Sequence, residues 1–312
     1  MNSVGKKKVD IIIPAYNAIA TSSRSLDSIV KQTYVNRIRV YVVDDFSIIP
    51  YNEIVSKYSD KVDIKLLRLE KNRGPGYARQ YGIDNSFSKY IMFLDSDDYI
   101  TDDVAIEMMI NEMEKYDYDA ISTFMSEDVF GKRKDYYVGF DTIHAKLYRR
   151  SFLKKYDITF PYYYNSEDVA FNNYVLLNTN KIGRVNVNSY TYHRRNNSLT
   201  QDKEYTSDRH VKCLCDNLLF VIEKAERQGV DKNYISSFLC NNLCYFMWYF
   251  HGVVTETAVL YLPVLVDYYY KYSDYYVESN GSFWLNYWII IVKNQYSKEQ
   301  FMLFLKTIKN KS

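Results

Sequence analysis

Apolar and polar positions follow two different periods in the first half of the chain. Short apolar runs, typical of strands buried on both faces, alternate with stretches in which apolar residues recur at helical spacing. The runs that we expect to form strands are Val9–Ile13, Ile38–Val43, Ile64–Leu69 and Tyr90–Leu94. The stretches that we expect to be helical are Ser22–Gln32, a short turn at Ile54 and Val55, and Gly76–Ser86. This alternation predicts an α/β fold in which helices flank a mostly parallel sheet.

The pattern changes near residue 205. A helix over Val169–Leu177 and a strand over Val185–Tyr192 precede this point, and glycine is scarce after it. Five later stretches have helical spacing: Val211–Gln228, Ile235–Phe250, Ala258–Tyr272, Phe283–Val292 and Lys298–Lys309. We therefore divide the chain into an α/β domain of residues 1–205 and a helical C-terminal region of residues 206–312.

The composition is that of an ordinary globular protein. The 312 residues are 47% hydrophobic and carry a formal net charge of +2, which is too small to favour nucleic acid as a partner. The late apolar runs Ala258–Val266 and Trp288–Val292 are too short to span a bilayer, and no signal peptide follows Lys6–Lys8. We expect a cytoplasmic protein, and attachment to the inner face of the membrane stays open.

Polar clusters follow the predicted strands at the points where they end. In a parallel sheet these carboxyl ends form one edge, and ligands bind there. The clusters are Tyr16-Asn17, Asp44-Asp45, Asn72–Arg79 and Asp95–Asp98. We therefore expect all four to contribute to one site.

The acidic cluster Asp95-Ser96-Asp97-Asp98 carries the strongest chemical signal. Three carboxylates within four residues repel one another unless a cation or hydrogen bonds compensate them. Mg²⁺ and similar hard cations take oxygen ligands and share them with substrate phosphates. One of the aspartates could instead cap a helix that starts near Asp102, but a cap does not account for three. The pattern also resembles a phosphatase motif in which the first aspartate is the nucleophile, although Tyr99 stands where that motif has Thr or Val.

Three further stretches each allow two interpretations. The loop Asn72–Arg79 places glycines and arginines at a helix start, where an anion could bind, and Gly74-x-Gly76 loosely imitates a dinucleotide fingerprint. The stretch Ser166-Glu167-Asp168 could supply a general base or only a helix cap. The basic stretch His193–Ser198 could close over a diphosphate or be a solvated loop.

Taken in order, these stretches resemble the family 2 glycosyltransferases, which have the GT-A fold. The matching stretches are Ile12–Asn17, Val42–Asp45, Asn72–Arg79, Leu94–Asp98, Lys146–Arg150, Glu167-Asp168, and Tyr192–Ser198 with Thr200. Each is weak alone, and their order along the chain makes the set specific. The resemblance implies transfer of a sugar, with inversion, from a nucleoside-diphosphate sugar to a hydroxyl group of a glycan or another surface polymer. It implies a UDP-sugar as donor.

The resemblance also implies a role for each matching residue. The donor would contact Pro14, Tyr16, Asn17, Asp44, Asp45, Gly74, Arg79, Asp95, Ser96, Arg195 and Ser198. Among these, Pro14, Tyr16 and Asp45 would line the nucleobase pocket, and Arg79 would lie near the base and phosphates. Asp97 would be the direct ligand of Mn²⁺ or Mg²⁺, and Asp95 and His193 are the other candidates for metal ligands. Asp168 would be the catalytic base, with Glu167 as second candidate. The acceptor would contact His144, Lys146 and Tyr148.

Three residues depart from the family's pattern: Phe46, where Gly or Asn is frequent, His144, where an aromatic residue is frequent, and His193, where Arg is frequent. The helical region 206–312 would bind the acceptor or join subunits into a homo-oligomer. The alternatives to the transferase are a metal-dependent, phosphatase-like hydrolase and a non-catalytic sugar-binding scaffold of the same fold.

Overall fold

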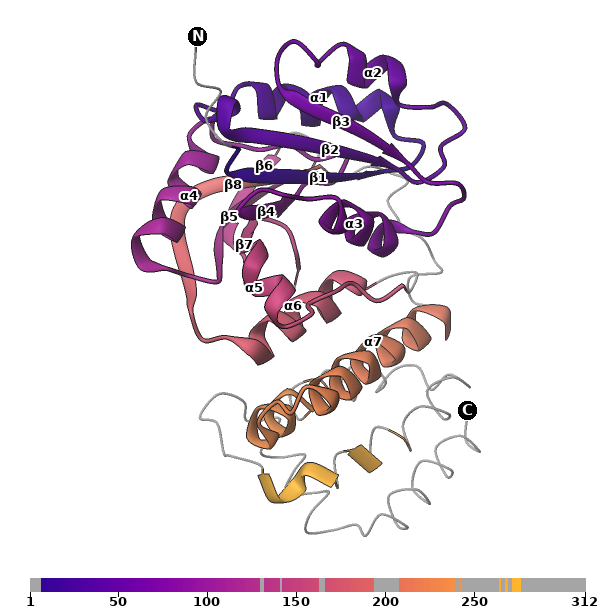
Figure 1. The fold of residues 1–312 in the computed structure, drawn as a ribbon, viewed down its shortest axis with the longest axis vertical. Coiled ribbons are helices and arrows are strands. Elements are labelled where there is room, and N and C mark those ends of the chain that lie inside the picture. Colours follow the sequence, from indigo (N-terminus) through magenta and orange to yellow (C-terminus); the bar gives the residue numbers. More distant parts are fainter. Residues whose placement is uncertain are drawn as a thin grey trace. The chain divides into compact units, whose positions relative to one another are not determined.

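The structure is a computed structural model of the chain. It describes residues 7–129, 132–140, 142–162, 166–193 and 208–239, together with residues 242, 264, 267–268 and 271–275. The chain consists of two compact units, Met1–Ser198 and Leu199–Ser312, which Figure 1 colours from indigo to yellow. The break lies near the boundary that we expected at residue 205, and the separate roles of the two parts stay predictions.

The first unit is built on an eight-stranded sheet with the order β3-β2-β1-β4-β7-β5-β6, in which β8 pairs with β5. The strands are β1 (Val9–Ala15), β2 (Ile38–Asp44), β3 (Asp63–Arg68), β4 (Tyr90–Phe93), β5 (Ala120–Val129), β6 (Lys132–Tyr137), β7 (Lys146–Arg149) and β8 (Ile182–His193). β1 pairs in parallel with β2 and β4, β2 with β3, and β5 with β8. The predicted strands and their parallel pairing are confirmed. The antiparallel strands β5, β6 and β7 were not predicted.

Helices cover both faces of the sheet. They are α1 (Ile19–Val30), α2 (Asn52–Ser56), α3 (Pro75–Asp84), α4 (Ala105–Tyr116), α5 (Arg150–Lys155) and α6 (Glu167–Asn178), and a short 3-10 turn covers Val35–Arg37. Figure 1 shows α1 and α2 on one side of β1–β3 and α3 on the other. The two faces of β1 agree with this arrangement, because Ile11 packs in one core with Leu26 and Ile29 of α1. Ile12 faces the opposite way and meets Gly82 of α3.

In the second unit, the structure describes α7 (Asp208–Arg227), a helical stretch over residues 232–239 and a 3-10 turn at Ser273–Tyr275. The predicted helix at Val211–Gln228 is therefore confirmed. The predicted helices at Phe283–Val292 and Lys298–Lys309 lie outside the described residues. Within the described part of the chain, no helix is both long enough and apolar enough to span a membrane.

Candidate active site

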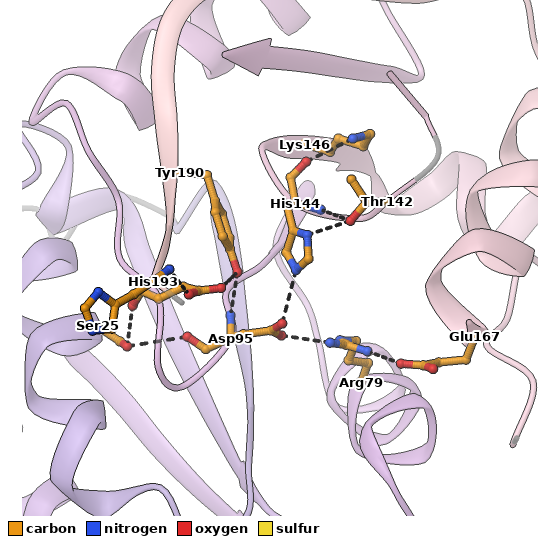
Figure 2. Close-up of polar contacts among 10 residues, drawn as sticks. Ser25, Arg79, Asp95, Thr142, His144, Lys146, Glu167, Tyr190 and His193 are labelled. Atoms are coloured by element: carbon orange, nitrogen blue, oxygen red, sulfur yellow. Dashed lines mark hydrogen bonds and ion pairs between the residues drawn. The ribbon is translucent and has the colours of Figure 1, made fainter. Parts of the chain in front are cut away.

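Arg79 joins two carboxylates that lie far apart in the sequence (Figure 2). Its Nη2 donates to Asp95 Oδ1 at 2.8 Å, and its Nη1 donates to Glu167 Oε1 at 2.5 Å. Its side chain is 6% exposed, as is that of Glu167. Burial by itself would lower the pKa of Arg79, but Asp95 and then Glu167 raise it above its ordinary value. Arg79 therefore stays charged and connects the end of β4 to the start of α6.

His144 contacts the other oxygen of the same aspartate. His144 Nε2 lies 3.1 Å from Asp95 Oδ2, and its Nδ1 lies 2.5 Å from Thr142 Oγ1. The imidazole also packs on the ring of Tyr190, with 4.8 Å between the centroids. Burial raises the pKa of Asp95, but Arg79 and His144 outweigh it and hold that pKa well below its usual range. The imidazole of His144 thus contacts Asp95, and the acceptor contact that we expected of it stays a prediction.

Asp98 is completely buried beneath the same cluster. The hydroxyl of Tyr190 donates to its Oδ2 at 2.6 Å, and the backbone N–H of His193 donates to its Oδ1 at 2.8 Å. Burial, and next the charges of Asp97 and Asp95, raise the pKa of Asp98 to about 8. Burial and the neighbouring carboxylates thus disfavour the charged form of Asp98, and a divalent cation bound here would favour it instead.

The donor atoms of this cluster fit such a cation by type and spacing. One ligand atom each from Asp95, Asp98 and His144 lie within 4.8 Å of one another, and Mg²⁺ and Mn²⁺ accept carboxylate oxygen and imidazole nitrogen. Asp97, the ligand that we expected, is half-buried and outside this group; its carbonyl oxygen accepts from Arg24 Nη2 at 2.5 Å. The imidazole of His193 lies beside Asp128 instead, with Nδ1 at 3.6 Å from Oδ2.

None of the acids of this cluster caps the helix that follows. The residue at the N-cap of α4 is Val104, which makes no side-chain capping hydrogen bond, and the nearby Asp102 accepts from the backbone of Asn188 at 2.9 Å. The alternative explanation of the acidic cluster as a helix cap is therefore wrong. Helix capping therefore does not account for the three aspartates of Asp95–Asp98.

Asp45 organises the loop that leads into α3. Its two carboxylate oxygens accept from Arg73 N at 2.7 Å and Gly74 N at 2.8 Å. Burial raises the pKa of Asp45, while these two backbone hydrogen bonds oppose the increase. Gly74 has φ 86°, a backbone conformation that glycine adopts easily because it has no Cβ. Asp45 fixes the start of α3, and a nucleobase would have to share its carboxylate with these amides.

The neighbouring residues of the expected donor pocket are exposed or support the turn. Asp44 is buried, where it accepts from Ser47 N at 2.9 Å and pairs with Arg68. Tyr16 is 52% exposed and Pro14 is half-buried. Asn17 and Ser96, which were also expected to contact the donor, make hydrogen bonds within the protein. Asn17 Oδ1 accepts from Ile48 N at 2.9 Å, and the carbonyl oxygen of Ser96 accepts from Thr21 Oγ1 at 3.1 Å.

Glu167 and Asp168 begin α6 and differ in their surroundings. Burial, and next the charge of Asp168, raise the pKa of Glu167 to about 7, although Arg79 opposes the increase. Asp168 is half-buried, and among the described residues no hydrogen bond to its side chain occurs. Its charge is close enough to raise the pKa of Arg79 and of His144. Asp168 thus lies close to the cluster formed by Arg79, His144 and Asp95.

The remaining residues that we expected to contact the acceptor or the donor are either buried or outside the described residues. Lys146 and Tyr148 are completely buried; Lys146 Nζ donates to the carbonyl of His144 at 2.9 Å, and the hydroxyl of Tyr148 donates to Asn172 at 2.6 Å. Burial of this extent leaves neither side chain a surface for an acceptor. Arg195 and Ser198 lie outside the described residues.

Comparison with solved structures identifies the fold. The chain resembles S. aureus TarS 1-349 in complex with UDP-GlcNAc, with a TM-score of 0.68 and 23% identity over 83% of this chain and 81% of that one. It also resembles the mannosyltransferase PcManGT of Pyrobaculum calidifontis in complex with GDP-Man and Mn²⁺, with a TM-score of 0.53 and 12% identity over 94% and 88%. The sheet and the acidic turn after β4 therefore define a protein of the GT-A type.

Sequence comparison supplies the family. The profile of glycosyl transferase family 2 matches residues 10–163, and this part of the chain belongs to that family, as its ordered motifs indicated. A curated relative is the poly(ribitol-phosphate) beta-N-acetylglucosaminyltransferase TarS of Staphylococcus aureus strain Mu50, 28% identical over 220 residues. That match covers 64% of this chain and 38% of TarS, so the chain spans less than half the length of this relative.

Proposed function

We propose that this chain is an inverting glycosyltransferase that moves a sugar from a UDP-sugar to a hydroxyl group of a polymeric acceptor. Family membership supports sugar transfer. The relative TarS is named for N-acetylglucosamine transfer to poly(ribitol-phosphate), and a solved structure of TarS holds UDP-GlcNAc. These names support a UDP-sugar as donor and a polyol-phosphate or glycan polymer as acceptor.

The observation that carries the proposal is the chain of contacts from the acidic turn to α6. Asp95 is held by His144 on one oxygen and by Arg79 on the other, and Arg79 continues to Glu167. These contacts hold the carboxylate of Asp95, which would bind the metal, in a fixed position relative to the start of α6, where Asp168 lies. Holding the reacting groups in place is how a transferase lowers the entropic cost of a reaction between two substrates.

The residues have separate tasks in this reaction. The carboxylate of Asp168 accepts the proton of the acceptor hydroxyl as its oxygen attacks the anomeric carbon from the side opposite the leaving nucleoside diphosphate. Arg79 and Glu167 orient the start of α6 so that Asp168 faces the substrate. Asp98, fixed by Tyr190 and His193, supports the acidic turn from below.

A divalent cation, Mn²⁺ or Mg²⁺, would be held by Asp95, Asp98 and His144, whose ligand atoms lie within 4.8 Å of one another, with Asp97 of the same turn as a further donor, and would offset the charge that develops on the leaving diphosphate. The charges of Asp97 and Asp95, which help to raise the pKa of Asp98, support this assignment. His193 is the weaker candidate, because its imidazole lies beside Asp128. Attachment to a membrane and assembly through the helical region stay predictions.

The experiment is donor turnover. A thermal-shift screen of nucleotide-sugars with Mn²⁺ would identify the donor, and release of the nucleoside diphosphate would then be measured with and without EDTA. We expect release that depends on the metal, is lost in Asp97→Ala, and is lost in Asp168→Asn while donor binding persists. Release of inorganic phosphate from a phosphomonoester would favour the hydrolase instead. Binding without any turnover would favour the scaffold.

A further inference from the structure

Phe46 has a backbone conformation that costs a bulky residue free energy. It follows Asp45 at the end of β2 and has φ 66°, in the left-handed region where Cβ crowds the next carbonyl oxygen. Glycine adopts this conformation without the penalty. Strained residues of this kind cluster at functional sites, where the surrounding structure over-determines them. The side chain of Phe46 is therefore a candidate for a function.

The ring of Phe46 is exposed but fixed in place. It is 49% exposed, and the guanidinium of Arg68 lies over it at 5.4 Å from the ring centroid. Arg68 is itself held by the carboxylate of Asp44 and by the carbonyl oxygen of Ser47, the latter at 2.9 Å. A cation thus covers one side of the ring, while the remaining surface faces solvent as a rigid aromatic platform.

This platform lies next to Tyr16. The carbonyl oxygen of the residue before Tyr16 accepts from Asp45 N at 2.8 Å, and Asn17 N donates to Ser47 Oγ at 3.0 Å. These two hydrogen bonds flank Tyr16 and Phe46 and bring the two residues to adjacent points at the ends of β1 and β2. Both are about half exposed. Two exposed aromatic residues therefore lie at the edge of the sheet where the nucleotide is expected.

We propose that Phe46 stacks on the nucleobase of the donor and determines part of the enzyme's affinity for nucleoside diphosphates. The inference rests on the proposed function, since it needs a nucleotide at this edge. A base offers a flat π surface to the ring, and the fixed Arg68 removes the cost of ordering the ring on binding. The gain in binding explains why a strained phenylalanine stands where glycine would be more stable.

Three variants separate stacking from strain. Phe46→Ala removes the ring and leaves a side chain at positive φ, whereas Phe46→Gly removes both the ring and the strain. Phe87→Ala is the matched control, because Phe87 is 70% exposed and lies at the opposite end of the strands, where its N–H donates to Asp10 of β1 at 2.8 Å.

UDP and inorganic pyrophosphate are titrated into each protein by calorimetry in Mg²⁺. We expect both Phe46 variants to bind UDP at least about fivefold more weakly, the low end of what base–aromatic stacking contributes, and pyrophosphate unchanged. Phe87→Ala should bind both ligands like the wild type. Without ligand, Phe46→Gly should melt at a higher temperature than the wild type, so that stability and affinity change in opposite directions.

The outcomes distinguish the two proposals. If the wild type binds no nucleotide, the proposed function fails and the stacking fails with it. If the wild type binds UDP and both Phe46 variants bind it as tightly, only the stacking is overturned. An equal loss for UDP and pyrophosphate also overturns it, because the ring would then shape the phosphate site.

Discussion

The buried position of Arg79 makes its replacement the sharpest test of the frame that holds the site. In Arg79→Met the guanidinium is lost, and a stem of similar length remains. Asp95 and Glu167 are then left without their cation, and breaking a buried ion pair in this way costs about 3–5 kcal/mol. Because Glu167 has a pKa of about 7, it can take up a proton in the variant and relieve part of the penalty. We therefore expect a loss of about 3 kcal/mol at neutral pH.

Arg133→Met is the matched control. Its Nε lies 2.8 Å from Asp135 Oδ1, with side chains 50% and 51% exposed, whereas Arg79 Nη2 lies 2.8 Å from Asp95 with side chains 6% and 24% exposed. An exposed pair of this kind contributes about 1 kcal/mol or less. Urea unfolding followed by circular dichroism gives both free energies. Equal losses in the two variants would refute the reasoning, since Arg79 is buried against two carboxylates and Arg133 is exposed against one.

Two other predictions follow from the same frame. The pKa of Glu167, raised to about 7 from its ordinary 4.5, means that the folded state binds this proton more tightly than the unfolded state does. The resulting stability is fully present below pH 4.5 and is lost as the pH rises through 7. Between about pH 4.5 and pH 9 the free energy of unfolding of the wild type should fall by on the order of 3 kcal/mol relative to that of Glu167→Gln. If urea unfolding showed the same dependence on pH for both proteins, this prediction would be contradicted. In Gly82→Ala, the new Cβ would lie 2.4 Å from Ile12 Cγ2. The clash should destabilise by about 1–3 kcal/mol, despite the better helix propensity of alanine; a raised midpoint in urea would show that α3 packs less closely on β1.

The sequence predicted the part of the fold that follows a regular period. The strands β1 to β4 are continuous apolar runs, and their polar ends meet as expected at one edge of the sheet. β6 was missed because Lys132–Tyr137 is mostly charged and has no apolar run. β5 and β7 were missed with it, since the antiparallel pairing of β7 with β5 and with β4 depends on contacts distant in the sequence.

The sequence indicated which residues belong to the candidate site more completely than it indicated which residues contact one another there. Arg79 at a helix start suggested a phosphate ligand, because nothing in the local sequence indicates that Glu167, 88 positions away, lies against it. His144 suggested an acceptor contact, yet it lies on Asp95. The sequence also did not reveal the backbone strain at Phe46. It showed that Phe46 stands where the family often has glycine, but not that the residue keeps a positive φ angle.

Proton NMR of UDP-GlcNAc turnover in Mg²⁺ tests the central claim most directly, because it reports both the leaving group and the anomeric configuration of the sugar. An inverting GT-A enzyme should release UDP, and the β-anomer of the sugar should appear first, with both signals absent in Asp168→Asn. The account would be contradicted if the α-anomer appeared first, or if no nucleotide-sugar released a nucleoside diphosphate in the presence of the wild type.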